Sequence, residues 1–190
     1  MGKGRLEAFS DGVLAVIITI MVLDMKAPQG ADLAALYAVL PVFLVYVLSF
    51  IYIGIYWNNH HHMLHAVERI DGLSMWANLN LLFWLSLVPF VTGWMGENHF
   101  AAAPTALYGV VLLMAAISYT LLQMALVRAN GRHAALAHAV GNDWKGKLSI
   151  ACYVAGIGVA FVHQAISDVL YAVVAVTWFI PDRRIERAAV

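Results

Sequence analysis

The sequence predicts an all-α membrane protein with six transmembrane helices. Hydrophobic residues make up 63% of the 190 residues and charged residues only 12%, whereas a soluble domain carries about 25% charged residues. The apolar residues form blocks of about 17 to 25, the length that crosses a bilayer as a helix. These blocks do not alternate with a period of two, so helices are favoured over a barrel, the other fold that pairs its backbone groups in lipid.

Each predicted span is an apolar block bounded by turn-forming or charged residues. Pro28 and Gly30 separate the first two spans, Asp71 caps the third, and Pro181 ends the last, where proline is a natural stop. No soluble domain or linker is visible, so residues 1–190 are expected to form a single domain. The predicted spans are 6–25, 33–57, 73–94, 105–127, 148–162 and 166–180.

The basic residues predict the orientation of these spans. With the N-terminus inside, ten of the eleven Lys and Arg residues fall on inner segments and only Lys26 falls outside. The positive-inside rule then places both termini in the cytoplasm of a multi-pass protein of the inner (plasma) membrane. The net charge of zero gives no sign of a nucleic-acid partner, and the single cysteine, Cys152, cannot form an internal disulfide.

The first span carries an aliphatic stripe. At about 100° per residue, Ile20 and Leu23 lie within about 40° of Val16, and Thr19 lies about 60° to one side. Aliphatic rings around an axis can gate ions by dewetting, and a hydroxyl can touch a passing ion. Apolar residues at this spacing are more often lipid-facing or core, and a Thr in a membrane helix usually bonds to its own backbone. Spacing alone therefore leaves both interpretations open.

Two polar residues of the same span lie on a different face of the predicted helix. Ser10 and Asp11 lie more than about 100° from Val16 on a helix. A carboxylate at membrane depth is costly, so it faces protein or water and marks a function or a buried network. We expect Asp11 to anchor the first helix to its neighbours, with Arg5 as a candidate charge partner.

Four stretches of the chain carry recognisable motifs: Arg5-x-x-x-Phe9-Ser10-Asp11-Gly12 with its aliphatic continuation, Trp57-Asn58-Asn59-His60-His61, Asn78-Leu79 followed by Pro89-Phe90-Val91-Thr92, and the terminal segment from Trp178 to Arg184. Together they resemble one known family, the endosomal and lysosomal potassium channels (transmembrane protein 175), in its bacterial branch. The first-helix motif is the most specific of them, and spans four and five match only in hydropathy.

The resemblance implies a passive, potassium-selective cation channel that is not an enzyme and needs no cofactor. It implies a homotetramer in which four first helices surround the axis. Their narrowest hydrophobic layer would be Val16, with further layers at Ile20 and Leu23, and Thr19 would be the hydroxyl linked to selectivity. No Thr-Val-Gly-Tyr-Gly-like run occurs in the chain, so a carbonyl filter of the ordinary potassium-channel kind is not predicted.

The resemblance also implies a structural role for the polar residues of the first helix. In the family, the Phe-Ser-Asp cluster is an anchor at the cytoplasmic side. Carried over to this chain, the anchor would be a polar network made of Arg5, Phe9, Ser10, Asp11, Trp57, His60 and Asn78.

Two other classes of protein remain as alternatives. His61 and His65 are four positions apart, a spacing that lets two imidazoles on a helix bind zinc, as in a His-box membrane metalloenzyme. Such enzymes gather several boxes and this chain has one, so we expect no metal and interpret the run as a helix C-terminus. A secondary cation transporter would usually show internal repeats or broken helices, and the sequence shows neither.

Overall fold

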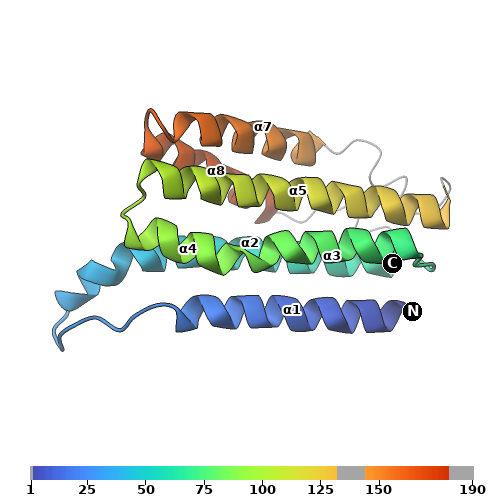
Figure 1. Cartoon of the computed structure of the whole chain (residues 1–190), viewed down its shortest axis with the longest axis horizontal. Coiled ribbons are helices and arrows are strands. Elements are labelled where there is room, and N and C mark those ends of the chain that lie inside the picture. The colour runs from blue at the N-terminus through green and yellow to red at the C-terminus, as the bar shows by residue number, and fades with distance from the viewer. Residues whose placement is uncertain (1, 132–143, 180–190) are drawn as a thin grey trace.

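A computed structural model describes residues 2–131 and 144–179, and it is all-helical. Its helices run alternately up and down one long axis to form a bundle (Figure 1). Because α3 and α4 follow one another along a single path, the described residues contain six helical segments, one for each predicted span. The helices are α1 (Lys3–Leu23), α2 (Ala35–His65), α3 (Gly72–Ser86), α4 (Val88–Glu97), α5 (Ala102–Asn130), α7 (Trp144–Val159) and α8 (Gln164–Phe179).

The bundle is that of a multi-pass membrane protein. Four segments are long and apolar enough to cross a membrane: α1, α2, α3 with α4, and α5. The apolar α8 and the neighbouring α7 are shorter, with 16 residues each. Large hydrophobic side chains also cover the outside of the bundle, where Trp76 is 73% and Val176 68% exposed. Apolar surface of this extent requires a lipid or protein covering.

The predicted third span contains a break that the hydropathy pattern does not show. It divides at Leu87 into α3 and α4, two residues before Pro89. Proline lacks a backbone N–H and its ring clashes with the carbonyl four residues earlier, here that of Leu85. Leu87 keeps right-handed helical angles, with φ −85° and ψ −11°. The expectation of unbroken helices is therefore wrong at this point, although the interruption is local and the chain does not unwind.

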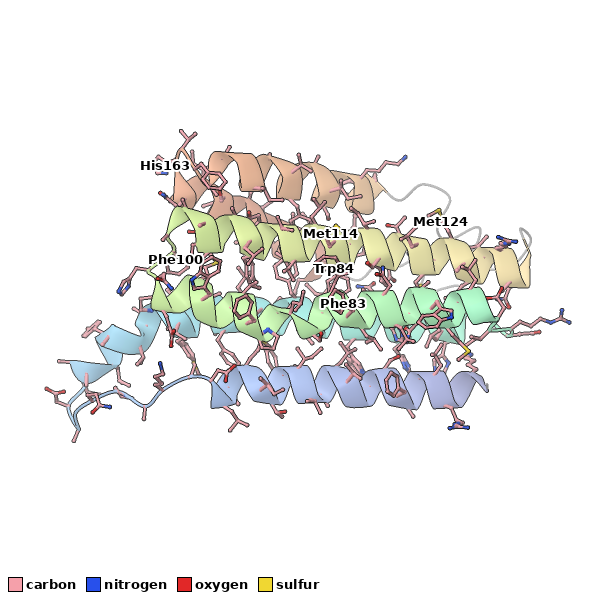
Figure 2. All side chains as sticks on the ribbon, viewed as in Figure 1. Phe83, Trp84, Phe100, Met114, Met124 and His163 are labelled. Carbon is pink, nitrogen blue, oxygen red and sulfur yellow. The ribbon has the colours of Figure 1, made fainter. Side chains whose placement is uncertain are left out.

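Helix α1 lies along one edge of the bundle, where it packs against α2, α3 and α4. Helix α5 contacts α3, α4, α7 and α8, and α2 contacts α4 and α8. Buried side chains fill the layers between the helices, and Trp84, labelled in Figure 2, packs against this core. One face of α1 joins this core through its buried residues, which are Leu6, Ser10, Leu14, Ile17 and Met21.

The two ends of the bundle differ in charge. Lys26 lies at the end where α1 finishes and binds Glu97 at 2.9 Å. The other described basic residues lie at the opposite end, where α1 begins and α2 and α5 finish: Lys3, Arg5, Arg69, Arg128, Lys145 and Lys147. The remaining basic residues of the chain, and the terminal motif beyond Phe179, lie outside the described residues. The cytoplasmic placement of the basic end stays a prediction.

The predicted cap of the third span is confirmed. Asp71 precedes α3, and its Oδ1 accepts hydrogen bonds from the Ser74 backbone N–H at 2.8 Å and from the Ser74 hydroxyl at 2.7 Å. These bonds favour the ionised form, so they hold the pKa of the Asp71 carboxyl below its ordinary value, the hydroxyl contributing most.

Candidate functional site

A chain of buried polar groups fastens α1 to α3 and α2. The Asn78 side-chain N–H donates to Ser10 Oγ at 2.9 Å, and the Ser10 hydroxyl donates to the Leu6 carbonyl at 2.9 Å. The His60 Nε2–H donates a hydrogen bond to Asn78 Oδ1 at 2.7 Å, which fixes the His60 tautomer. Ser10 and Asn78 are fully buried and His60 is 2% exposed. Buried polar groups satisfied in this way specify one rotation of α1.

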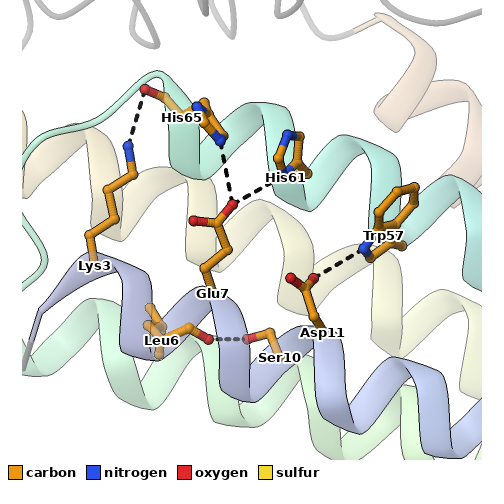
Figure 3. Close-up of polar contacts among 8 residues, drawn as sticks. All are labelled: Lys3, Leu6, Glu7, Ser10, Asp11, Trp57, His61 and His65. Atoms are coloured by element: carbon orange, nitrogen blue, oxygen red, sulfur yellow. Dashed lines mark hydrogen bonds and ion pairs between the residues drawn. The ribbon is translucent and has the colours of Figure 1, made fainter.

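A second polar contact joins α1 to α2 nearer the surface. The indole N–H of Trp57 donates to Asp11 Oδ1 at 3.0 Å, as Figure 3 shows. Trp57 is 47% exposed, and Asp11 is half-buried. The carboxylate therefore faces protein on one side of α1, which is the direction that the helical angles predict.

Two residues of the expected polar network lie apart from these contacts. Phe9 is 49% exposed. Arg5 is also exposed, and among residues 2–131 and 144–179 its side chain makes no hydrogen bond or ion pair, while its backbone N–H donates to the Gly2 carbonyl at 3.1 Å. The structure thus brings together Ser10, Asn78 and His60 in one group and Asp11 and Trp57 in another. The functional weight of each residue stays a prediction.

The aliphatic stripe of α1 is exposed in the part of the chain that the structure describes. Val16 is 54%, Ile20 41% and Leu23 80% exposed, whereas Leu14 and Ile17 are 2% and 3% exposed. Thr19 lies on the exposed face as well, and its hydroxyl donates to the Val16 carbonyl at 2.9 Å. Within residues 2–131 and 144–179, one face of α1 is therefore left exposed.

A groove runs beside this stripe. Its volume is about 820 Å³, and it lies between α1 and the region where α3 breaks into α4. Val16 and Ile20 contribute to the α1 wall, and Pro89 and Phe90 contribute to the opposite wall. The break at Leu87 thus shapes a surface next to the candidate pore-lining face.

An acidic residue that sequence reasoning left out completes a cluster with the histidine run. Glu7 Oε1 lies 3.0 Å from His61 Nδ1 and 3.5 Å from His65 Nε2 (Figure 3). The three ligand atoms lie within 4.8 Å of one another, close enough to hold a metal ion together. Glu7 precedes Asp11 by four positions, so both project from the same side of α1 toward α2. That spacing is the signal that would have included it.

Comparison with known proteins decides the family. A protein of Chryseobacterium sp. named a potassium channel is 52% identical over 188 residues, covering 99% of this chain and 98% of that protein. The chain belongs to the TMEM175 family. The family profile, described as the endosomal/lysosomal potassium channel TMEM175, matches residues 5–89. That segment holds both polar groups and the stripe, and the Chryseobacterium and human relatives are named as ion channels rather than enzymes.

A solved structure of a TMEM175 relative has the same fold. It is the crystal structure of a lysosomal potassium-selective channel TMEM175 homolog from Chamaesiphon minutus, with a TM-score of 0.82 and 27% sequence identity. The match covers 95% of this chain and 97% of that one. The human relative, named an endosomal/lysosomal proton channel, is 35% identical over 96 residues, or 44% of this chain and 19% of the human protein. The predicted family and six-span fold are therefore confirmed.

Proposed function

We propose that this protein is a potassium-permeable channel of the plasma membrane whose pore is lined by α1 helices from several copies. The observation that carries the proposal is the division of α1 into two faces. One face is buried and polar-anchored, and the other exposes Val16, Thr19, Ile20 and Leu23 in the part of the chain that the structure describes. Two bacterial relatives named as potassium channels agree with this function.

The proposed constriction follows from the chemistry of the exposed face. Aliphatic side chains of Val16, Ile20 and Leu23, repeated around an axis, form narrow layers in which water is unstable, so they gate by dewetting. Thr19 is the hydroxyl on this face, and an ion leaving its hydration shell would meet it. Its O–H already donates to the Val16 carbonyl at 2.9 Å, so the oxygen lone pairs are free to face a cation.

The proposed assembly is a homotetramer, as the family resemblance implies. The groove beside α1 supports close association, because its apolar walls with Phe90 and Ile20 can receive side chains of a second copy. Packing against another chain would cover the same edge of the bundle that carries the stripe. The polar anchor then transmits the orientation of each chain to its α1, and hence to the pore wall.

Ion flux into liposomes tests the proposal. Purified protein is reconstituted, and potassium, sodium and proton gradients are applied separately. We expect electrogenic potassium flux that exceeds sodium flux. The proton gradient is included because the human relative is named a proton channel. Absence of flux under all three gradients, from protein that retains its oligomeric state in detergent, would overturn the channel proposal.

Matched alanine variants locate the pathway. Leu23→Ala and Val16→Ala should raise flux or reduce potassium selectivity severalfold, because each widens a proposed hydrophobic layer. Leu121→Ala on α5 and Val176→Ala on α8 remove the same atoms from side chains that are 45% and 68% exposed elsewhere. Equal changes in the two pairs would show that the stripe is lipid-facing surface.

A further inference from the structure

The cluster of Glu7, His61 and His65 joins two helices at the end of the bundle where α1 begins and α2 finishes. His61 and His65 follow one another by one turn of α2, with ring centroids 4.3 Å apart. Glu7 reaches them from α1. Its side chain is 19% exposed, whereas those of His61 and His65 are 41% and 48% exposed. The cluster is thus reachable from solution but partly sheltered by the two helices.

We propose that these three residues form a binding site for a divalent transition metal ion, with Zn²⁺ as the preferred ion. Two imidazole nitrogens and one carboxylate oxygen are ligands that Zn²⁺ favours. Tetrahedral coordination with bonds of about 2.05 Å separates its ligand atoms by about 3.3 Å. The observed separations of 3.0 and 3.5 Å from Glu7 Oε1 bracket that value. Small rotamer adjustments bring all three atoms to one ion, and water completes the fourth position.

The surroundings orient these ligands. The Trp57 ring stacks on His61, with centroids 6.2 Å apart and planes 26° apart, and this limits rotation of the imidazole. The Lys3 ammonium on α1 donates to the His65 carbonyl at 3.3 Å, on the backbone rather than toward the ligand atoms. Asp11, one turn further along α1, is engaged by Trp57. The Glu7 carboxylate therefore supplies the negative charge of the site.

Metal binding would hold α1 to α2 more strongly than a simple ion pair does. A partly exposed Glu–His pair is screened by solvent and contributes little. Three coordinate bonds to one ion would instead hold the beginning of α1 against the end of α2. This inference stands apart from the proposed function, since the ligand geometry is present whether or not α1 lines a pore. It also revises the expectation from sequence that the histidine run binds no metal.

Zn²⁺ binding to the full chain tests the site directly. The protein is purified in detergent with an affinity tag that contains no histidine, stripped with chelator and titrated with Zn²⁺ by calorimetry. We expect one ion per chain. Glu7→Gln, His61→Gln and His65→Gln should each weaken binding by more than roughly tenfold, the effect that loss of even an outer-shell partner produces. Glu7→His, which keeps three ligand atoms, should retain binding.

Two histidine variants act as controls. His62→Gln alters the imidazole that lies edge-on to His61 but belongs to no cluster in the described chain, and His99→Gln alters an exposed histidine near the other end of the bundle. Both should bind Zn²⁺ as the unaltered protein does. Absence of Zn²⁺ uptake, or an equal loss in His62→Gln, would overturn the proposal. The His65 side chain is exposed, so the His65→Gln variant should fold normally. An unchanged elution volume of this variant on size exclusion would show that its loss of Zn²⁺ binding is not a loss of fold.

Discussion

The two faces of α1 have similar hydropathy and opposite surroundings. Leu14 and Ile17 are buried against neighbouring helices, whereas Val16 and Leu23 are exposed. An apolar side chain cannot distinguish these positions, because lipid and protein core are both apolar. The difference comes from Ser10 and Asp11, whose partners lie on α2 and α3. A few polar contacts therefore decide which aliphatic face is offered to ions, lipid or another copy.

Typical hydrogen-bond energies are large enough for these polar contacts to fix the rotation of α1. A hydrogen bond contributes about 0.5–1.5 kcal/mol net, but a buried group left unpaired costs about 1–3 kcal/mol. Rotation of α1 would break the contacts from Asn78 to Ser10 and from Trp57 to Asp11 together. Substitutions on the anchored face should therefore change stability, whereas substitutions on the exposed face should change ion flux.

The largest effect on stability is expected from Asn78→Leu. The change removes both the donor to Ser10 and the acceptor for His60, and it leaves the buried His60 N–H unpaired. We expect a loss of about 1–3 kcal/mol in the free energy of unfolding, measured by thermal or detergent denaturation. Asn58→Leu, on the half-buried surface of α2, is the control. Equal losses in the two variants would contradict the anchoring role.

A smaller loss is expected from Trp57→Phe. Phenylalanine keeps most of the ring but cannot donate to Asp11 Oδ1. Because Trp57 is 47% exposed, water replaces part of the lost bond. We expect a loss of about 1 kcal/mol, read from the unfolding midpoint in detergent. The matched control is Trp76→Phe on α3, whose ring is 73% exposed. The anchor at Asp11 would be unsupported if the control lost as much stability.

Thr19→Val is expected to affect selectivity and leave stability almost unchanged. The Thr19 hydroxyl bonds only its own helix, at the Val16 carbonyl, so the change in unfolding free energy should stay below about 0.5 kcal/mol. The potassium-to-sodium flux ratio should fall severalfold. Thr177→Val on α8 removes a hydroxyl with the same type of bond, to the Val174 carbonyl at 2.7 Å. A flux ratio that moves equally in both variants would rule out a special position for Thr19.

The smallest effect is expected in the pH dependence of stability, through Asp71 at the start of α3 rather than through either face of α1. Ser74 lowers the pKa of Asp71, so this cap stabilises the folded chain above the unfolded-state pKa of the carboxyl. The contribution is lost as the pH falls through the depressed folded-state pKa. Asp71→Asn should flatten the acid side of the stability profile slightly, while flux at neutral pH stays unchanged. A large change in flux would mean that the start of α3 is coupled to the pore.

Hydropathy was sufficient to predict the six spans, because a membrane helix must be apolar over a set length. It did not predict the break at Leu87, since Pro89 interrupts hydrogen bonding without altering the apolar pattern. The helical angle correctly placed Asp11 away from Val16. The same calculation places Arg5 on the side of Val16, because Arg5 precedes Val16 by eleven positions and so lies about 20° from it on a helix. The structure leaves Arg5 exposed on that side, whereas family resemblance placed it in the polar network.

Contacts between helices were the least predictable part of the site. The spacing of His61 and His65 is visible along α2, but Glu7 approaches them from another helix, and sequence spacing does not encode that distance. The grouping of Ser10 with His60 and Asn78 was expected only through family resemblance, because these three residues lie on three different helices.

Cysteine accessibility tests most directly the claim that α1 presents its exposed face to the pore. In a Cys152→Ser background, Thr19→Cys and Leu23→Cys are compared with Leu14→Cys on the buried face. A charged, water-soluble thiol reagent is applied while potassium current is recorded across a bilayer. We predict rapid loss of current in Thr19→Cys and Leu23→Cys, and none in Leu14→Cys. Unchanged current in the two exposed-face variants, with labelling from the lipid phase instead, would contradict a pore built from α1.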